Sequence, residues 1–99
     1  MKKRIPATTI GFLDSAKSLK EIGSDYGLAK FLEVKPQSVS NWRAGRSFLD
    51  DSVCEKVAAA LDLPVGYVLA CVHAERAKTE SLRDAWASVA ASFSMPAAA

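Results

Sequence analysis

The chain has 99 residues, the size of a single domain with one modest core, because a chain of this length buries roughly two thirds of its unfolded surface. Hydrophobic residues make up 49% of the sequence. No uncharged apolar run approaches the ~20 residues that a membrane span needs, and the start, MKKRIPATT, lacks the apolar core of a signal peptide. We therefore expect a cytoplasmic protein with no membrane segment.

The net charge of +2 hides an uneven distribution along the chain. Residues 1–46 carry nine Lys or Arg and four Asp or Glu, whereas residues 47–99 carry four and seven. A basic half beside an acidic half is typical of a protein that presents one face to a polyanion and another to a partner, although a chance division of charges gives the same pattern.

The residues that usually carry chemistry are scarce. Cys54 and Cys71 form no CxxC pair, so we expect both to be reduced core residues without a disulfide. His73 is the one histidine, which argues against an acyl-transfer triad and against a metal site. We predict a protein that is not an enzyme and has no cofactor or metal.

Helical periodicity begins close to the N-terminus. Apolar residues recur at three- and four-residue spacing over residues 12–22, after Thr9 as a predicted N-cap and before Gly23 as the expected stop. Ser24 then has the character of an N-cap for a short second helix over about residues 25–32. No alternating strand pattern is longer than four residues, which predicts an all-α fold.

A proline interrupts this pattern at Pro36. At the first position of a helix a proline is harmless, whereas inside a helix it costs about 3 kcal/mol or more. We therefore expect the second helix to end near Leu32, Lys35 to be extended, and a third helix to span about residues 36–44 with Gly45 at its end.

The third helix has one apolar face. Val39 and Trp42 lie together on a helix of 3.6 residues per turn and are expected to face the core. Ser38 is then on the flank, and the outward side chains are Gln37, Ser40, Asn41 and Ala44. Amide side chains carry both a donor and an acceptor and can match adenine N6 and N7 in a major groove, while nearby Arg and Lys neutralise phosphates.

Two further helices are predicted in the middle of the second half. Ser52 and Glu55 have the spacing of a capping box in front of a fourth helix that ends near Asp62. Pro64 is typical of a first-turn proline and opens a fifth helix. The sequence therefore predicts five to six short helices in all.

The sixth helix, which Ser81 and Asp84 are expected to cap, has the clearest apolar stripe. The stripe can complete the core of a monomer or remain exposed for dimerisation. Its members are Leu82, Ala85, Trp86, Val89, Ala90 and Phe93, of which Trp86, Val89 and Phe93 form the candidate dimer interface.

The segment DYGLAKFLEVKPQSVSNWRAG, about a quarter of the chain, resembles the helix-turn-helix of the lambda-repressor-like family of phage and bacterial regulators. The family usually has Gly where this chain has Glu33, and often a phosphate-contacting Gln where it has Asp25. The resemblance rests on Leu28, Ala29, Val34, Val39, Ser40, Trp42 and Gly45.

The resemblance implies a sequence-specific regulator of transcription that binds double-stranded DNA, most simply a phage or prophage repressor acting as a homodimer on a palindromic operator. It assigns base contacts to Gln37, Ser38, Ser40 and Asn41, with a phosphate role also open to the two serines. It also implies that the side chains of Lys35, Arg43 and Arg46 contact DNA phosphates. The main-chain N–H groups of Ser24, Asp25 and Tyr26 are implied to do the same.

The implied organisation is a basic arm at residues 1–8, a DNA-binding domain at 9–77, an additional amphipathic helix at 78–93 and a disordered tail at 94–99. Two other functions fit the sequence. The C-terminal helices can grip a protein partner, as in an antitoxin or adaptor, and the same helix-turn-helix can belong to a DNA-bending accessory protein for excision or replication.

Overall fold

The computed structural model describes residues 7–93, and this part of the chain contains helices and no strand. The predicted all-α bundle of five to six helices is confirmed. The helices are α1 (Thr9–Leu19), α2 (Asp25–Leu32), α3 (Pro36–Arg43), α4 (Asp51–Leu61), α5 (Val65–Arg76) and α6 (Glu80–Ala91).

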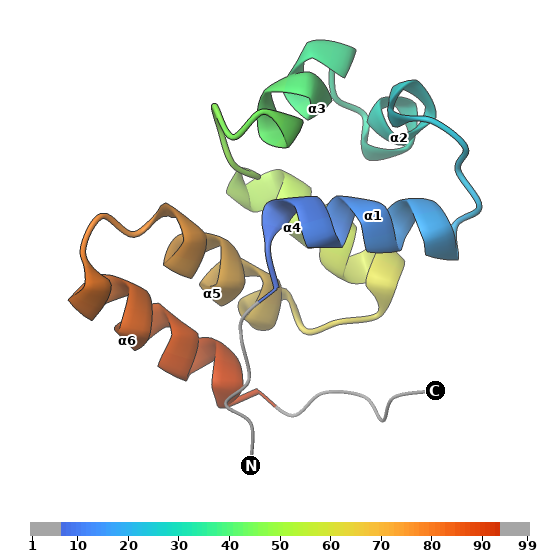
Figure 1. Cartoon of the computed structure of the whole chain (residues 1–99). Coiled ribbons are helices and arrows are strands. Elements are labelled where there is room, and N and C mark those ends of the chain that lie inside the picture. The colour runs from blue at the N-terminus through green and yellow to red at the C-terminus, as the bar shows by residue number, and fades with distance from the viewer. Residues whose placement is uncertain (1–6, 94–99) are drawn as a thin grey trace.

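The six helices divide into an α2–α3 end, a middle formed by α1 and α4, and an α5–α6 end (Figure 1). α2 packs against α3, α1 against α4, α4 against α5, and α5 against α6. One core runs through the middle, and its largest fully buried side chains include Leu13, Leu28, Leu32, Leu49, Val57 and Val68. Within residues 7–93, every helix is too short or too polar to cross a membrane.

The last two residues of the basic arm predicted at residues 1–8 are part of the folded domain. Ala7 packs against the core, and the Thr8 side chain accepts a hydrogen bond from the Gly11 N–H at 3.1 Å, which makes Thr8 the N-cap of α1. The rest of the arm and the tail predicted at residues 94–99 lie outside the described residues.

The N-cap predicted at Thr9 is therefore wrong by one residue. Thr9 is 1% exposed, and its backbone N–H and its Oγ1 both donate to Glu75 Oε1, at 2.9 and 2.7 Å. A buried hydroxyl needs a hydrogen-bond partner. Thr9 finds that partner on α5, so it ties α1 to α5 while its neighbour caps the helix.

Two predicted capping boxes are also displaced toward the N-terminus. Asp50, not Ser52, caps α4 by accepting from the Val53 N–H at 3.0 Å. Thr79, not Ser81, caps α6 by accepting from the Leu82 N–H at 3.1 Å. In each case a second capping residue stands two positions earlier, and capping there lets the helix begin two residues sooner.

Four helices end in the same way, with one residue in the left-handed region. The N–H of the following residue then reaches back to a carbonyl five residues earlier, which closes the last turn. Gly45 terminates α3 with φ 77°, as predicted. Glu21, not the predicted Gly23, terminates α1 with φ 56°, and the Ile22 N–H donates to the Lys17 carbonyl at 2.8 Å.

The turn between α2 and α3 uses a residue that is poorly suited to it. Glu33 has φ 61° and ψ 42°, the conformation that a glycine adopts without penalty. The Val34 N–H donates to the Ala29 carbonyl at 2.9 Å, and Lys56 Nζ donates to the Leu32 carbonyl at 2.9 Å. The resemblance to a family with Gly at this position predicts such a backbone, and these hydrogen bonds hold it in spite of the side chain.

The apolar stripe of α6 divides between covered and exposed residues. Ala90 is buried, Trp86 stacks on His73 of α5 with ring centroids 4.6 Å apart, and Phe93 covers Gly66 of α5. Three stripe residues remain exposed on the helix: Ala85 and the larger side chains Leu82, at 53%, and Val89, at 44%. The stripe therefore completes the core through some residues and leaves others accessible.

Replacing Glu33 by Gly is expected to raise the free energy of unfolding by about 0.5 to 1 kcal/mol, because it removes the left-handed penalty of a side chain at the cost of some backbone entropy. The exposed Glu33–Lys56 ion pair, 3.1 Å long, contributes little. Denaturant unfolding measures the difference. Glu33→Ala is the control, since it deletes the pair but keeps the strain, and a Gly variant no more stable than the Ala variant would contradict the prediction.

Candidate functional site

α3 presents the polar face that its sequence predicts. Val39 and Trp42 are buried, at 1% and 5% exposure, and they fix the helix on the core. The residues expected to face outward do so: three are exposed and Asn41 is half-buried, with Ser38 half-buried on the flank. The three exposed residues are Gln37, Ser40 and Ala44.

The outward side chains are joined to one another. Gln37 Nε2 donates to Asn41 Oδ1 at 3.1 Å, one helical turn away. Arg46, which follows the Gly45 turn, folds back so that its Nε donates to the same oxygen at 3.0 Å. The face therefore carries an ordered array of amides and one guanidinium.

Arg43 faces the other helices and takes part in an ion-pair network. Its Nη1 donates to Asp14 Oδ1 of α1 at 2.7 Å, and its Nε and Nη2 donate to the two oxygens of Asp25 at the start of α2, at 3.2 and 3.0 Å. Lys17 Nζ joins Asp25 Oδ1 at 3.1 Å. Forked contacts of this kind between a guanidinium and a carboxylate are directional as well as charged.

The network fixes α3 relative to α1 and α2. The hydrogen bond from Arg43, assisted by Lys17, holds the pKa of the Asp25 carboxyl below its usual value, although partial burial opposes the shift. The predicted phosphate contact of Arg43 stays a prediction, and only the two N–H donors that these ion pairs do not use are left for it. Lys35 and Arg46 are exposed, at the beginning and just beyond the end of α3.

The three residues expected to contact phosphates through their backbone lie at the start of α2. Ser24 is the N-cap, as predicted, and its Oγ accepts from the Gly27 N–H at 3.0 Å. The Asp25 side chain is turned toward Arg43, while Tyr26 is exposed with Lys30 Nζ 5.7 Å from its ring centroid. Asp25 thus neutralises Arg43, as well as carrying a charge that suits a helix N-terminus.

Sequence reasoning missed the partners that support this face. Asp14, Lys17 and Lys56 belong to α1 and α4, and they meet residues of the α2–α3 unit that are distant along the chain. No spacing rule connects residues 14 and 43, since only the crossing of α1 over α3 brings them together. The sequence shows that these residues are charged, but their positions along the chain do not indicate which residues they pair with.

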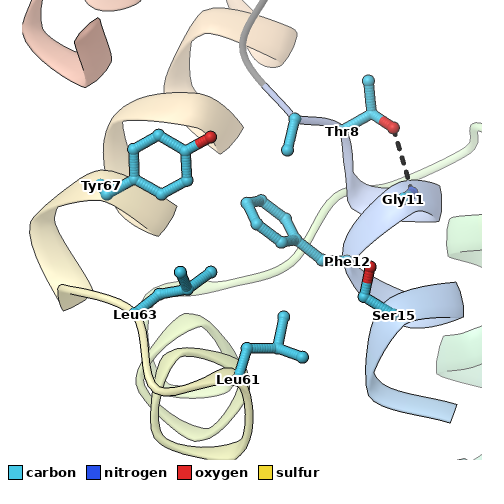
Figure 2. A pocket seen from close by; sticks show the side chains of 8 residues that line it. Thr8, Gly11, Phe12, Ser15, Leu61, Leu63 and Tyr67 are labelled. Carbon is cyan, nitrogen blue, oxygen red and sulfur yellow. Dashed lines mark hydrogen bonds between the residues drawn. The ribbon is translucent and has the colours of Figure 1, made fainter. Parts of the chain in front are cut away.

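A pocket lies away from α3, between the start of α1 and the α4–α5 turn (Figure 2). Its polar side chains are the three hydroxyls of Thr8, Ser15 and Tyr67, of which Thr8 accepts a hydrogen bond from the Gly11 N–H. No carboxylate, imidazole or amine side chain is among its lining residues. It is an open, mainly apolar depression, lined by Ala7, Thr8, Gly11, Phe12, Ser15, Leu61, Leu63 and Tyr67.

The two cysteines lie inside the core, and both are free, as predicted. Burial raises the pKa of the Cys54 thiol to about 11 and also raises that of Cys71, so neither is an activated nucleophile at neutral pH. Over residues 7–93 no group of three or more His, Cys, Asp or Glu side chains is arranged to hold a metal ion. The face of α3 is the candidate functional site.

Comparison of the chain with known protein families, with curated proteins and with solved structures found no match. The interpretation of the α3 face therefore depends on its own geometry and chemistry.

The Arg43 network is expected to make stability depend on pH in the acid range. Because the pKa of Asp25 is lower in the folded protein than in the unfolded chain, its contribution is fully present above the unfolded pKa, near 3.8, and is lost as pH falls through the folded pKa. Arg43→Met should therefore lower stability at neutral pH and flatten its decline on acidification. Thermal unfolding between pH 7 and pH 2 measures both effects.

Asp84→Asn, which neutralises an exposed carboxylate on α6, is the control and should leave the acid limb unchanged. An acid limb of equal steepness in Arg43→Met and in the parent protein would show that the network contributes nothing to folding.

Proposed function

We propose that this protein is a non-enzymatic, sequence-specific regulator of transcription that binds double-stranded DNA by inserting α3 into the major groove. The observation that supports the proposal best is the hydrogen-bonded amide array of Gln37 and Asn41 on the outward face of α3. Amide side chains are well matched to base edges, and an α-helix fits the width of the major groove.

The charges around α3 suit a duplex. Lys35 and Arg46 lie near the two ends of the helix, so each is placed for the phosphates that flank a groove. Ser24 and Tyr26 begin α2, whose N-terminal N–H groups favour an anion. Ser38 and Ser40 have hydroxyls that suit either a base or a phosphate.

The packing and ion pairs that hold α3 in place also favour the recognition of DNA. Val39 and Trp42 bury one face, and Arg43 ties the end of the helix to α1 and α2. A preorganised reading face loses less conformational entropy on binding than a mobile one. With the resemblance to lambda-repressor-like regulators, this supports a phage or prophage repressor as the simplest form of the function.

A homodimer is part of the proposal, with a second copy of α6 as the occupant of its exposed stripe. Leu82 and Val89 lie two turns apart on one side of α6 and are both exposed. One copy of α3 offers few base contacts, whereas a dimer doubles them and sets two half-sites about 34 Å apart. The α5–α6 end is separate from α3, so self-association leaves the reading face open (Figure 1).

The amide array should account for specificity and the flanking cations for general affinity. We expect Gln37→Ala combined with Asn41→Ala to cost about 1 to 3 kcal/mol at each base position that these residues read, with little effect on binding to random duplexes. Selection from a random-sequence duplex pool, followed by titration at two salt concentrations, measures this. A motif that survives the double substitution would contradict the proposal.

Lys35→Ala should weaken binding to all sequences and reduce the dependence of affinity on salt, because it removes one phosphate contact. Lys78→Ala is the matched control, since Lys78 is an exposed lysine in the α5–α6 connection, and it should leave both quantities unchanged. Equal effects of the two substitutions would show that Lys35 acts only through net charge.

The exposed part of the α6 stripe should control self-association. Val89→Asp places a charge on an exposed apolar position, so we expect a shift from dimer to monomer in sedimentation velocity and weaker binding to a palindromic duplex, with stability nearly unchanged. Ser88→Asp adds the same charge at the neighbouring exposed position and is the control. If Val89→Asp affects neither mass nor DNA binding, the exposed stripe of α6 is not a dimer interface.

A further inference from the structure

The hydrogen bonds on the α3 face fix which way the Asn41 amide points. An arginine Nε–H can only donate, so the Asn41 atom that lies 3.0 Å from Arg46 must be its oxygen. The Gln37 atom that faces the same oxygen at 3.1 Å must then be its nitrogen. The orientation of both amides therefore follows from one obligate donor, Arg46.

This arrangement removes the acceptor of Asn41 from the reading face. A carbonyl oxygen has two lone pairs, and Gln37 and Arg46 occupy both. The Asn41 Nδ2 group has no hydrogen-bond partner within residues 7–93, so what it offers to a base is two N–H donors. Asparagine commonly pairs with adenine by accepting from N6 and donating to N7. Here the Asn41 oxygen is already occupied, so it cannot accept from adenine N6.

Gln37 keeps both functions. Its Nε2 uses one N–H on Asn41 and retains a second, while its Oε1 accepts no hydrogen bond from residues 7–93. Gln37 can therefore still donate to N7 and accept from N6 of adenine. The two residues lie one helical turn apart, about 6 Å along the axis, which is close to two base-pair steps of about 3.4 Å.

We propose that Asn41, held by Gln37 and Arg46 as a donor-only side chain, selects guanine, while Gln37 reads adenine about two base-pair steps away. Guanine presents two acceptors in the major groove, N7 and O6, whereas adenine places its N6 amino group where Asn41 has no acceptor to offer. The inference rests on the proposed function and adds the base that the site recognises. Arg46 acts here as a positioning residue for Asn41.

The test begins with selection of duplexes from a random-sequence pool by the full chain and by Asn41→Ala, which identifies the position that Asn41 reads. Dissociation constants are then measured for duplexes with each of the four base pairs at that position. We expect guanine to be preferred over adenine by at least about fivefold, the lower end of what one good base contact contributes.

Asn41→Asp is the sharpest variant, because a carboxylate still accepts from Gln37 and Arg46 but presents an acceptor to the groove. The preference should move from guanine to cytosine, whose N4 amino group donates. Arg46→Met frees one lone pair of the Asn41 oxygen for a base and should lower the guanine-to-adenine preference. Lys35→Met is the matched control, since it removes the same charge from the other end of α3 and should weaken binding without changing that preference.

Adenine preferred at the Asn41 position, or an unchanged preference in Arg46→Met, overturns the assignment of guanine and leaves DNA binding intact. Equal affinity for all duplexes, or no binding, overturns the proposed function and this inference with it. The two failures are therefore distinguishable in one set of titrations.

Discussion

The turn from Leu32 to Pro36 is the constraint on which the rest of the structure depends. Glu33 takes the left-handed conformation, so α2 cannot continue, and Pro36 can only begin a helix. Between them Lys35 is extended, with ψ 146°. The angle between α2 and α3 is thus set within four residues, and that angle decides which side of α3 is buried and which is left to solvent.

The far end of α3 is fixed by charge instead of by backbone geometry. Arg43 bridges carboxylates of α1 and α2. The short helix α3 is therefore fixed at its start by the α2–α3 connection and at its end by ion pairs. Along its length it is held by the buried side chains of Val39 and Trp42. Short helices are marginal on their own, and packing must supply their stability. The same anchoring holds the outward amides in one arrangement, which is what selective recognition requires.

The cations around α3 therefore divide by role. Arg43 is paired within the fold, whereas Arg46 is an exposed residue that donates a hydrogen bond to Asn41, and Lys35 is exposed. At the opposite end, Thr9 and Glu75 couple α1 to α5, and α6 completes the core through Trp86 and Phe93. Residues for the proposed DNA contact and for the proposed self-association thus lie at separate ends of a molecule with one shared core.

The sequence alone predicted the six helices, the break at Pro36, the stop at Gly45 and the buried pair Val39 and Trp42, because periodicity, proline and glycine act over a few residues. It misplaced three N-caps, since several Ser, Thr and Asp residues compete near each helix start and packing decides among them. Tertiary structure alone decided that Arg43 meets Asp14 and Asp25, because these contacts join separate helices and no local pattern contains them. The bond from Arg46 to Asn41 is close in sequence, but it depends on how Arg46 folds back after the Gly45 turn, which the pattern of residue types does not specify.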